Sequence, residues 1–275
     1  MGVPYAEVIG DPVVHSKSPT IHKFWLARLG LDGDYRATRV PAGNLRSYLE
    51  ARRGDPDWRG CNVTMPLKQA VVPLLDEVEE GLPSLNCVIP RGGGLVGFDT
   101  DREGISEATS NWLFAPTENA VCLIGAGGAA RAFVASIPVE CAFDLRVLAR
   151  DPRRAARLLK SLGVDGAALW IDDAERALVD CAAVINASPL GMTGFPPMPD
   201  TVLDSLCGLR RGGYVLDMVT SPVETVLLRR AREAGLTAVD GLAVLIGQAR
   251  RAFERFYGLL PSRACDEELR ALLAR

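Results

Sequence analysis

Two residues of opposite charge end short motifs and could together move a proton. Lys68 ends the segment GCNVTMPLK, and Asp101 ends GFDTD. We expect a strand over residues 60–64 and then a helix that begins at Pro66, which would place Lys68 in its first turn. The positive end of a helix disfavours an ammonium and lowers its pKa, as a proton-transferring lysine requires. The alternative is that Lys68 is an ordinary exposed lysine and that Asp101 only caps the next helix.

Polar side chains near these residues could hold a small substrate. Ser16 and Ser18 flank a lysine in HSKSP, directly before a helix predicted over residues 19–29. Two hydroxyls beside a helix N-terminus suit a small carboxylate, although Ser18 could instead be only the N-cap of a helix that begins at Pro19. Asn62 and Thr64 lie two residues apart on the predicted strand and therefore point the same way.

A glycine-rich turn in the middle of the chain is typical of a nucleotide site. Gly125, Gly127 and Gly128 occur in GAGGAAR, after the apolar strand predicted over residues 120–124 and before an Ala-rich helix. A dinucleotide fold needs a tight turn there and a backbone that lets amides approach the pyrophosphate. Ala130 replaces the third glycine of the GxGxxG pattern, and its small side chain still permits close packing. The alternative is an ordinary glycine turn.

Arginines follow the second strand of this region, at 145–149. Arg150, Arg153 and Arg154 form a guanidinium cluster that suits the 2′-phosphate of NADP, whereas an NAD site usually has a carboxylate there. Asp151 opposes this interpretation unless it is the N-cap of the helix that begins at Pro152. We therefore predict a preference for NADP. The alternative is a solvated, arginine-rich helix start.

The predicted elements indicate an α/β protein with two domains. The first 100 residues alternate strands and helices, with strands or strand ends at 7–10, 34–40 and 60–64, a hairpin of 85–90 and 95–98, and a helix from Asp101 to about Leu113. After a linker at 115–119, strands alternate with helices, which predicts a parallel sheet covered on both faces, with further strands at 182–186 and 214–218.

The chain is predicted to end on a long amphipathic helix over residues 242–257. Its apolar stripe contains Leu242, Leu245, Ile246, Ala249, Phe253 and Phe256, and Gln248 flanks that stripe. We expect a substrate-binding and catalytic domain over 1–102, to which residues 240–275 return. A Rossmann-type dinucleotide-binding domain is expected over 103–239.

Composition limits the classes of protein to which the chain can belong. The 275 residues are 48% hydrophobic and 24% charged, and the net charge is −3, which disfavours disorder and a dedicated nucleic-acid binder. No segment reads as a membrane span or a secretory signal. Seven scattered cysteines without CxxC spacing predict reduced thiols in a cytoplasmic protein and no metal site. A hydrolase would have to use one of the two histidines, His15 or His22, and the sequence contains no nucleophile elbow to accompany it.

Taken together, these motifs resemble those of the shikimate dehydrogenases. The resemblance runs the whole length of the chain in seven ordered blocks: EVIGDPVVHSKSPTIH, GCNVTMPLK, LNCV with GFDTD, GAGGAAR, VINASPLGM, VLDMVTSPVETVLL and DGLAVLIGQARRAFERFYG. It implies NADPH-linked reduction of 3-dehydroshikimate to shikimate, in the biosynthesis of chorismate and the aromatic amino acids. The implied partners are small molecules, without nucleic acid or membrane, and the chain is expected to be a monomer or a homodimer.

The resemblance also implies roles for individual residues. Lys68 and Asp101 would be the catalytic pair, and Ser16 and Ser18 would hold the substrate carboxylate. Thr64, Asn86 and Gln248 would bind the ring hydroxyls. Asn62, which lies on the same face of the predicted strand as Thr64, is also expected to contact the substrate. NADP would be bound by Gly125, Ala126, Gly127, Gly128, Ala129, Arg150 and Arg154, with Met218 and Gly241 on the nicotinamide side.

Several positions depart from the family pattern. Asp99 stands where the family usually has Asn, and a second carboxylate would repel an anionic substrate unless it were turned away. The other departures are Thr220 for Tyr, Ala149 and Asp151 for the Asn and Thr that flank Arg150, Cys87 for Thr and Lys23 for Asn. Two alternatives therefore remain open: a related enzyme acting on quinate or another cyclic hydroxy acid, and a non-catalytic regulator that binds NADPH.

Overall fold

The computed structural model describes residues 2–79, 84–113, 119–137 and 143–274. The chain divides into two compact units, the first formed by Met1–Gly104 and Ile246–Arg275 and the second by Ile105–Leu245. The predicted linker at 115–119 falls outside the described residues except for Asn119, and so does Cys141. Within the described ranges, no helix is long and apolar enough to cross a membrane.

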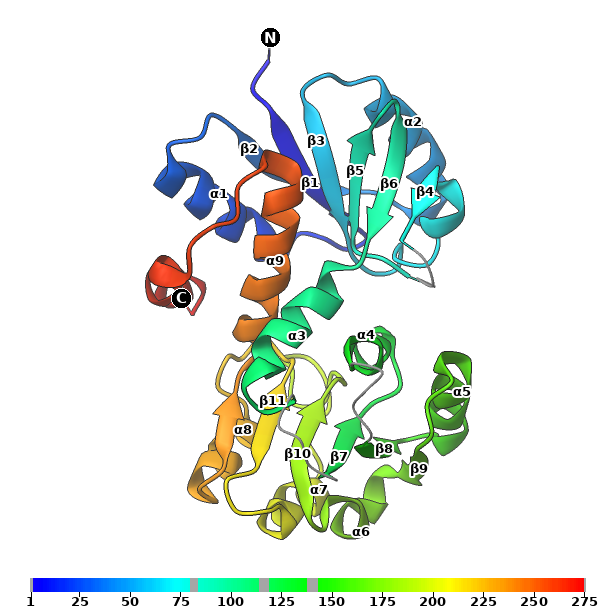
Figure 1. The fold of residues 1–275 in the computed structure, drawn as a ribbon, viewed down its shortest axis with the longest axis vertical. Coiled ribbons are helices and arrows are strands. Elements are labelled where there is room, and N and C mark those ends of the chain that lie inside the picture. Colours follow the sequence, from blue (N-terminus) through cyan, green and yellow to red (C-terminus); the bar gives the residue numbers. More distant parts are fainter. Residues whose placement is uncertain (1, 80–83, 114–118, 138–142, 275) are drawn as a thin grey trace. The chain divides into compact units, whose positions relative to one another are not determined.

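Unit 1 is built on a mixed sheet with the strand order β2-β1-β3-β5-β6-β4 (Figure 1). β1 pairs in parallel with β2 and β3, while β5 pairs antiparallel with β3 and β6. The strands are β1 Tyr5–Gly10, β2 Asp34–Arg39, β3 Trp58–Val63, β4 Glu77–Val78, β5 Cys87–Arg91 and β6 Gly94–Phe98. The predicted hairpin is confirmed, and its turn uses Gly92 and Gly93, both with positive φ, which glycine adopts without steric cost.

Both faces of this sheet are covered, as the burial of β1 along its whole length shows. Tyr5 and Ile9 pack in one core with Leu45 and Leu49 of α2, whereas Ala6 and Val8 pack in another with aromatic and aliphatic residues of α9. This follows from the alternation of side chains along a strand. The helices of unit 1 are α1 Ser18–Leu29, α2 Leu45–Arg53 and α10 Asp266–Leu273, joined by the later part of α9 Gly241–Tyr257 and the start of α3 Thr100–Leu113.

Unit 2 contains a fully parallel sheet with the order β12-β11-β10-β7-β8-β9. The chain runs outward from β7 in one direction through β8 and β9, then returns to β10 beside β7 and continues in the other direction. This is the doubly wound topology of dinucleotide-binding folds, in which ligands bind at the carboxyl ends of the strands where the order reverses. The predicted fold class, including the Rossmann-type second domain, is confirmed.

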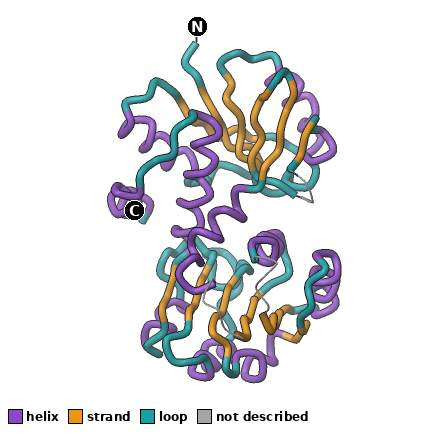
Figure 2. Tube along the Cα trace, in the orientation of Figure 1, coloured by secondary structure: helices purple, strands orange, loops and turns teal. Residues whose placement is uncertain are grey.

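Helices lie on both faces of the unit 2 sheet, and Figure 2 shows strands between helices there. Val121 and Leu123 of β7 share a core with helices α4 and α5, while Cys122 and Ile124 share a second core with α6, α7 and α8. The strands are β7 Asn119–Ile124, β8 Phe143–Ala149, β9 Ala167–Trp170, β10 Cys181–Asn186, β11 Tyr214–Asp217 and β12 Thr237–Val239. The helices are α4 Gly128–Ser136, α5 Pro152–Leu162, α6 Ala174–Leu178, α7 Asp200–Asp204 and α8 Val226–Glu233.

Two local predictions about unit 1 are wrong, and a third is displaced by one residue. No helix begins at Pro66, because residues 67–71 form turns and the short 3-10 helix Val72–Leu74 follows. Proline at 73 has no amide to donate, and its ring would clash with the carbonyl four residues earlier, so a helix begun at Pro66 cannot continue regularly through it. Ser18 is the first residue of α1 and not its cap, since Lys17 is the N-cap residue and makes no side-chain cap bond. Finally, α3 begins at Thr100, one residue earlier than expected.

Candidate active site

Lys68 and Asp101 form an ion pair in unit 1, although they are 33 residues apart in the chain. Lys68 comes from the turns after β3 and Asp101 from the first turn of α3. Their side chains are 31% and 26% exposed, so both remain in contact with solvent. An ammonium and a carboxylate in direct contact can exchange a proton with a ligand that reaches them.

The pKa of Lys68 is shifted in the direction opposite to the one expected. Burial by itself would lower the pKa of the ammonium, but the charge and hydrogen bond of Asp101, together with the charge of Asp99, raise it above its ordinary value. The expectation of a lowered pKa is therefore wrong. It rested on a helix N-terminus that does not exist, and the two nearby carboxylates act in the opposite direction. Lys68 consequently holds its proton at neutral pH.

Asn86 extends this pair into a network of side chains. Its amide nitrogen donates to Asp101 Oδ1 at 2.8 Å and to Gln248 Oε1 at 3.3 Å. Its amide oxygen accepts from the Thr100 amide at 2.7 Å. Asn86 and Gln248 are only 4% and 8% exposed. The network thus joins the turn after β3, the residue before β5, the start of α3 and the helix α9.

The structure adds Thr100, which sequence analysis missed. This residue is fully buried, and its hydroxyl lies 3.1 Å from Asn86 Oδ1 and 3.3 Å from Gln248 Oε1. It therefore orients the two amides that flank Asp101. In the sequence, only its place between two aspartates at a helix start pointed to a role at the site. Its partners, Asn86 and Gln248, come from distant segments and could not be identified from the sequence.

Asn62 is connected to the network from the interior side. Its side-chain oxygen accepts a hydrogen bond from the Tyr35 hydroxyl at 2.6 Å, and its amide nitrogen donates to the main-chain oxygen of Asn86 at 3.1 Å. Asn62 is 6% exposed. Both ends of its amide are thus bonded within the protein, which suits a residue that fixes Asn86 better than one that binds a ligand directly. Tyr35 was not among the residues expected at the site.

Ser16, Ser18 and Thr64 lie in unit 1 with local contacts. Ser16 Oγ accepts from the Ser18 amide at 3.3 Å, and Ser18 is buried. Because Ser18 does not cap α1, its hydroxyl has no capping role, and the alternative interpretation of this residue is removed. The lysine between the serines, Lys17, donates from Nζ to the carbonyl oxygen of Leu273 at 2.8 Å, which ties HSKSP to the end of α10. Thr64 follows β3 and is partly exposed.

The glycine loop of unit 2 has the backbone that a nucleotide site requires. Gly125 has a φ of +110°, and a Cβ there would lie 3.0 Å from the carbonyl oxygen of Ala187, so only glycine fits. A Cβ on Gly127 or Gly128 would meet no atom within 4 Å. The helix α4 begins at Gly128 without a side-chain cap. Open space above an uncapped helix start fits the pyrophosphate of a dinucleotide.

Arg150 and Arg154 are exposed and follow β8. The glycine loop follows the parallel neighbour β7, so both segments lie at the carboxyl ends of the strands. Asp151 is the N-cap of α5, and its Oδ1 accepts from the Arg153 amide at 3.0 Å. The carboxylate is thus used by the helix, which resolves the objection that Asp151 raised to an NADP site. The two exposed guanidiniums after β8 match the charge of a 2′-phosphate.

Met218 and Gly241 are brought together in unit 2. A Cβ on Gly241 would lie 2.7 Å from the carbonyl oxygen of Met218 and 2.4 Å from that of Val219, so glycine permits this close approach. Met218 directly follows Asp217, whose fully buried carboxylate accepts bonds from the Asn186 amide at 2.9 Å and the Thr225 hydroxyl at 2.6 Å. These bonds fix the loop that carries Met218.

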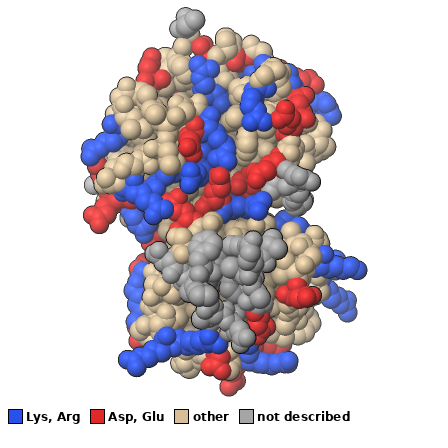
Figure 3. Space-filling view, viewed as in Figure 1, with Lys and Arg blue, Asp and Glu red and all other residues tan. Residues whose placement is uncertain are grey.

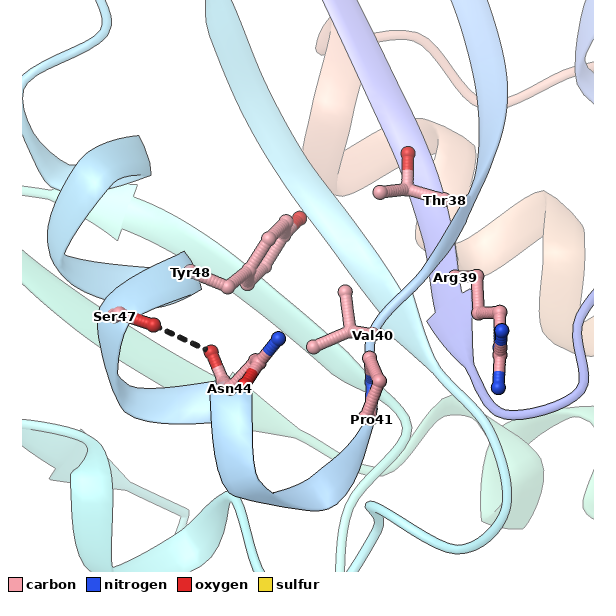
Figure 4. Close-up of a pocket in the computed structure, with 7 residues that line it drawn as sticks. All are labelled: Thr38, Arg39, Val40, Pro41, Asn44, Ser47 and Tyr48. Atoms are coloured by element: carbon pink, nitrogen blue, oxygen red, sulfur yellow. Dashed lines mark hydrogen bonds between the residues drawn. The ribbon is translucent and has the colours of Figure 1, made fainter.

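Unit 1 also has a pocket that contains none of the predicted site residues. It is lined by residues at the end of β2 and the start of α2, namely Thr38, Arg39, Val40, Pro41, Asn44, Ser47 and Tyr48 (Figure 4). Two of its polar side chains are used within the protein. Ser47 donates to the Asn44 carbonyl at 3.0 Å, and Arg39 pairs with Asp11 at 2.7 Å.

Comparison with known proteins agrees with this geometry. A family model described as the shikimate dehydrogenase substrate binding domain matches residues 8–87. The NADP(+) shikimate dehydrogenase of Sphingopyxis alaskensis is 44% identical, and the alignment covers 98% of this chain and 97% of that protein. The corresponding enzyme of Paramagnetospirillum magneticum is 38% identical over 98% of this chain and 97% of its own length.

Solved structures with the same fold include enzymes with bound ligands. Shikimate 5-dehydrogenase from Thermus thermophilus, in complex with NADP(H) and shikimate, is 33% identical with a TM-score of 0.82, and the match covers 98% of this chain and 99% of that one. Quinate dehydrogenase from Corynebacterium glutamicum, in complex with NAD, is 29% identical with a TM-score of 0.82, over 98% of this chain and 99% of that one.

The doubly wound unit, the glycine loop and the ammonium–carboxylate pair, together with these similarities, define an NADP-dependent oxidoreductase. The chain belongs to the shikimate dehydrogenase family.

Proposed function

We propose that this protein catalyses the reversible, NADPH-dependent reduction of 3-dehydroshikimate to shikimate, a step in the biosynthesis of chorismate and the aromatic amino acids. The observation that carries the proposal is the network of Lys68, Asp101, Asn86 and Gln248, in which four distant segments converge on one ammonium–carboxylate pair. A purely binding protein has no need for a couple that can transfer a proton to its ligand.

In this proposal, unit 1 binds the substrate. Ser16 and Ser18 donate their hydroxyls to the substrate carboxylate, and Thr64 together with the amides of Asn86 and Gln248 binds the ring hydroxyls. The amides of Asn86 and Gln248 are already oriented by Thr100, so less side-chain freedom is lost on binding. Asn62 acts from behind by fixing Asn86 through its main-chain oxygen.

Lys68 is proposed as the proton donor in the reduction and as the acceptor in the oxidation. Its ammonium bonds the ketone oxygen, stabilises the negative charge that develops there and gives it a proton. Asp101 fixes the ammonium in place and keeps it charged, because their contact raises the pKa of Lys68. A lysine that holds its proton at neutral pH is suited to start in the reductive direction.

Unit 2 is proposed as the NADP-binding domain. The amides of the glycine loop, Gly125 to Ala129, would hold the pyrophosphate, and Arg150 with Arg154 would hold the 2′-phosphate. Met218 and Gly241 would line the nicotinamide side, where the hydrogen bonds of Asp217 fix the loop. NADPH, when bound, supplies the hydride that the reduction requires.

The proposal also covers location and assembly. The charges on the face shown in Figure 3 are mixed in sign on each unit, which supports small molecules as the partners and disfavours nucleic acid. The six cysteines in the described residues are free thiols, which supports a cytoplasmic protein. We propose a monomer or homodimer, which sedimentation analysis at several concentrations would decide.

The direct test is an assay of nucleotide reduction at 340 nm (the absorbance of NADPH) with two substrates, shikimate and quinate, and two nucleotides, NADP+ and NAD+. We expect the highest kcat/KM for shikimate with NADP+. Faster turnover of quinate would assign the chain to the alternative enzyme. Binding of NADPH without turnover of either acid would instead identify a regulator.

A further inference from the structure

Asp99 lies at the start of the helix that carries Asp101. Its Oδ1 accepts a hydrogen bond from the Asp101 amide at 3.1 Å, so Asp99 caps the first turn of α3. The cap fixes the backbone from which the Asp101 carboxylate reaches Lys68 and Asn86. Capping was the alternative role for Asp101, but in the structure Asp99 is the cap, and the Asp101 carboxylate is left to its partners Lys68 and Asn86.

Asp99 also belongs to the charge cluster around the ion pair. The groups that act on it are Asp101 and Arg102 of α3 and Lys68 from the turns after β3. Burial and the charge of Asp101 raise the pKa of Asp99 to about 6, although Lys68, the Asp101 amide and Arg102 act in the opposite direction. In return, the charge of Asp99 contributes to the raised pKa of Lys68.

We propose that Asp99 is a positioning carboxylate beside the catalytic pair, which fixes Asp101 through its main-chain amide and, when ionised, adds a second negative charge near the Lys68 ammonium. The proposal deepens the function proposed above and rests on it. Asp99 is a positioning residue, because it acts through Asp101 and Lys68.

The positioning role and the charge of Asp99 are separable. A protonated carboxyl group still accepts the Asp101 amide on its carbonyl oxygen, so the cap survives when Asp99 takes up a proton. The charge does not survive. Below the pKa of Asp99, Lys68 faces one carboxylate, and above it Lys68 faces two. Lys68 therefore keeps its proton to a higher pH than Asp101 alone would allow. This favours the reduction and moves the onset of the oxidation to a higher pH.

The test is Asp99→Asn, which keeps the acceptor for the Asp101 amide and removes the charge. For the wild type, we expect the pH profile of kcat/KM for shikimate oxidation to show an inflection near pH 6 from Asp99 and an alkaline one from Lys68. In Asp99→Asn, the inflection near pH 6 should disappear, and the alkaline one should move down by about half to one pH unit.

Asp76→Asn is the matched control. Asp76 is also an aspartate of unit 1 that accepts a main-chain amide, that of Leu95 at 2.7 Å, but it pairs with Arg53 and lies outside the charge cluster. Its profile should coincide with that of the wild type. Should Asp99→Asn fail to fold, Asp99→Ser retains a hydroxyl that caps helices well and removes the same charge. The same downward shift is expected of it.

A second measurement keeps this proposal separate from the proposed function. The pH dependence of reductive methylation at Lys68, followed by mass spectrometry, reports the pKa of the amine without any turnover. A lower pKa of Lys68 in Asp99→Asn supports the proposal even if shikimate is not the substrate. If methylation of Lys68 follows the same pH curve in the wild type and in the Asp99 variants, the proposal is overturned.

Discussion

Two carboxylates, one in each unit, end up in opposite surroundings. Asp101 in unit 1 pairs with an ammonium and is 26% exposed. Asp217 in unit 2 is fully buried, and the partners it has among the described residues are neutral, namely the side chains of Asn186 and Thr225 and the Val219 amide. Burial raises the pKa of Asp217, and these three hydrogen bonds oppose that rise.

The difference shows what each carboxylate can do. A carboxylate that pairs with an ammonium and remains partly exposed can take part in proton transfer, because a ligand can reach the pair. A carboxylate enclosed by neutral donors holds backbone and side chains in one arrangement, since each donor would be left unsatisfied without it. In the proposed function, Asp101 therefore serves the chemistry on the substrate, and Asp217 holds a loop that we expect beside the nucleotide.

The largest effect is expected from Lys68→Ala. Loss of the group that accepts the proton should lower kcat for shikimate oxidation by about 10²- to 10⁴-fold. The free energy of unfolding should change by less than about 1 kcal/mol, because the ion pair is partly exposed. Steady-state kinetics and urea denaturation measure the two quantities. Lys23→Ala, which breaks the exposed pair with Asp34, is the control and should keep full activity. Near-normal turnover by Lys68→Ala would refute its catalytic role.

Asp217→Ala should show the reverse pattern. Three donors lose their acceptor inside unit 2, so the free energy of unfolding should fall by about 3 kcal/mol. Urea denaturation measures the loss. Asp204→Ala removes an exposed carboxylate of the same unit that pairs with Arg230, and it should cost less than about 0.5 kcal/mol. If both variants were equally stable, the contrast between the two carboxylates would not hold.

His22 extends the comparison to a buried group without any charged partner. Its ring is fully buried and stacks on Tyr35 at 3.9 Å, and burial lowers its pKa from 6.5 to about 3. Between these values the unfolded chain binds a proton that the folded chain does not, so stability rises with pH over this window. Lowering the pH from 7 to 5 should therefore cost about 2 kcal/mol.

The measurement is urea denaturation of the wild type and His22→Phe at pH 5 and pH 7. The phenylalanine keeps a ring against Tyr35 and cannot titrate. Its loss of stability between the two pH values should be smaller than that of the wild type by about 2 kcal/mol. Equal losses in the two proteins would show that His22 is not the group responsible.

Local signals in the sequence predicted unit 2 well. The strand, glycine loop and helix around Gly125 are contiguous in the chain, so their geometry follows from neighbouring residues. Asp151 before Pro152 is likewise a local capping pattern, and the structure confirms it. In such segments, the residues that determine the conformation lie within a few positions of one another.

The site in unit 1 was harder to predict from the sequence, because it depends on contacts between distant segments. The helix predicted at Pro66 ignored the second proline at 73, and the expected pKa of Lys68 failed with it. Thr100 and Tyr35 could not be found from the sequence, since their partners lie 14 and 27 residues away or further. Asn62 was expected to bind the substrate, but both ends of its amide are bonded within the protein.

Arg150→Ala tests whether unit 2 selects the nucleotide by charge. Arg150 is exposed after β8, so its loss should leave stability unchanged. Removing one guanidinium from the 2′-phosphate should raise KM for NADP+ by about tenfold and leave KM for NAD+ nearly unaltered. Arg157→Ala, an exposed arginine further along α5, is the control. If Arg150→Ala and the wild type discriminated equally between NADP+ and NAD+, Arg150 would have no part in the preference.

The smallest effect is expected from Lys17→Met, which tests how unit 1 holds its serines. Lys17 ties the segment between Ser16 and Ser18 to the end of α10 through the Leu273 carbonyl. Loss of one such hydrogen bond should raise KM for shikimate about threefold, and kcat and KM for NADP+ should not change. Arg28→Met removes the exposed pair with Glu268 on the same two helices and should leave all three constants unchanged. A fall in kcat without a rise in KM would show that Lys17 acts on the chemistry and not on the placement of the serines.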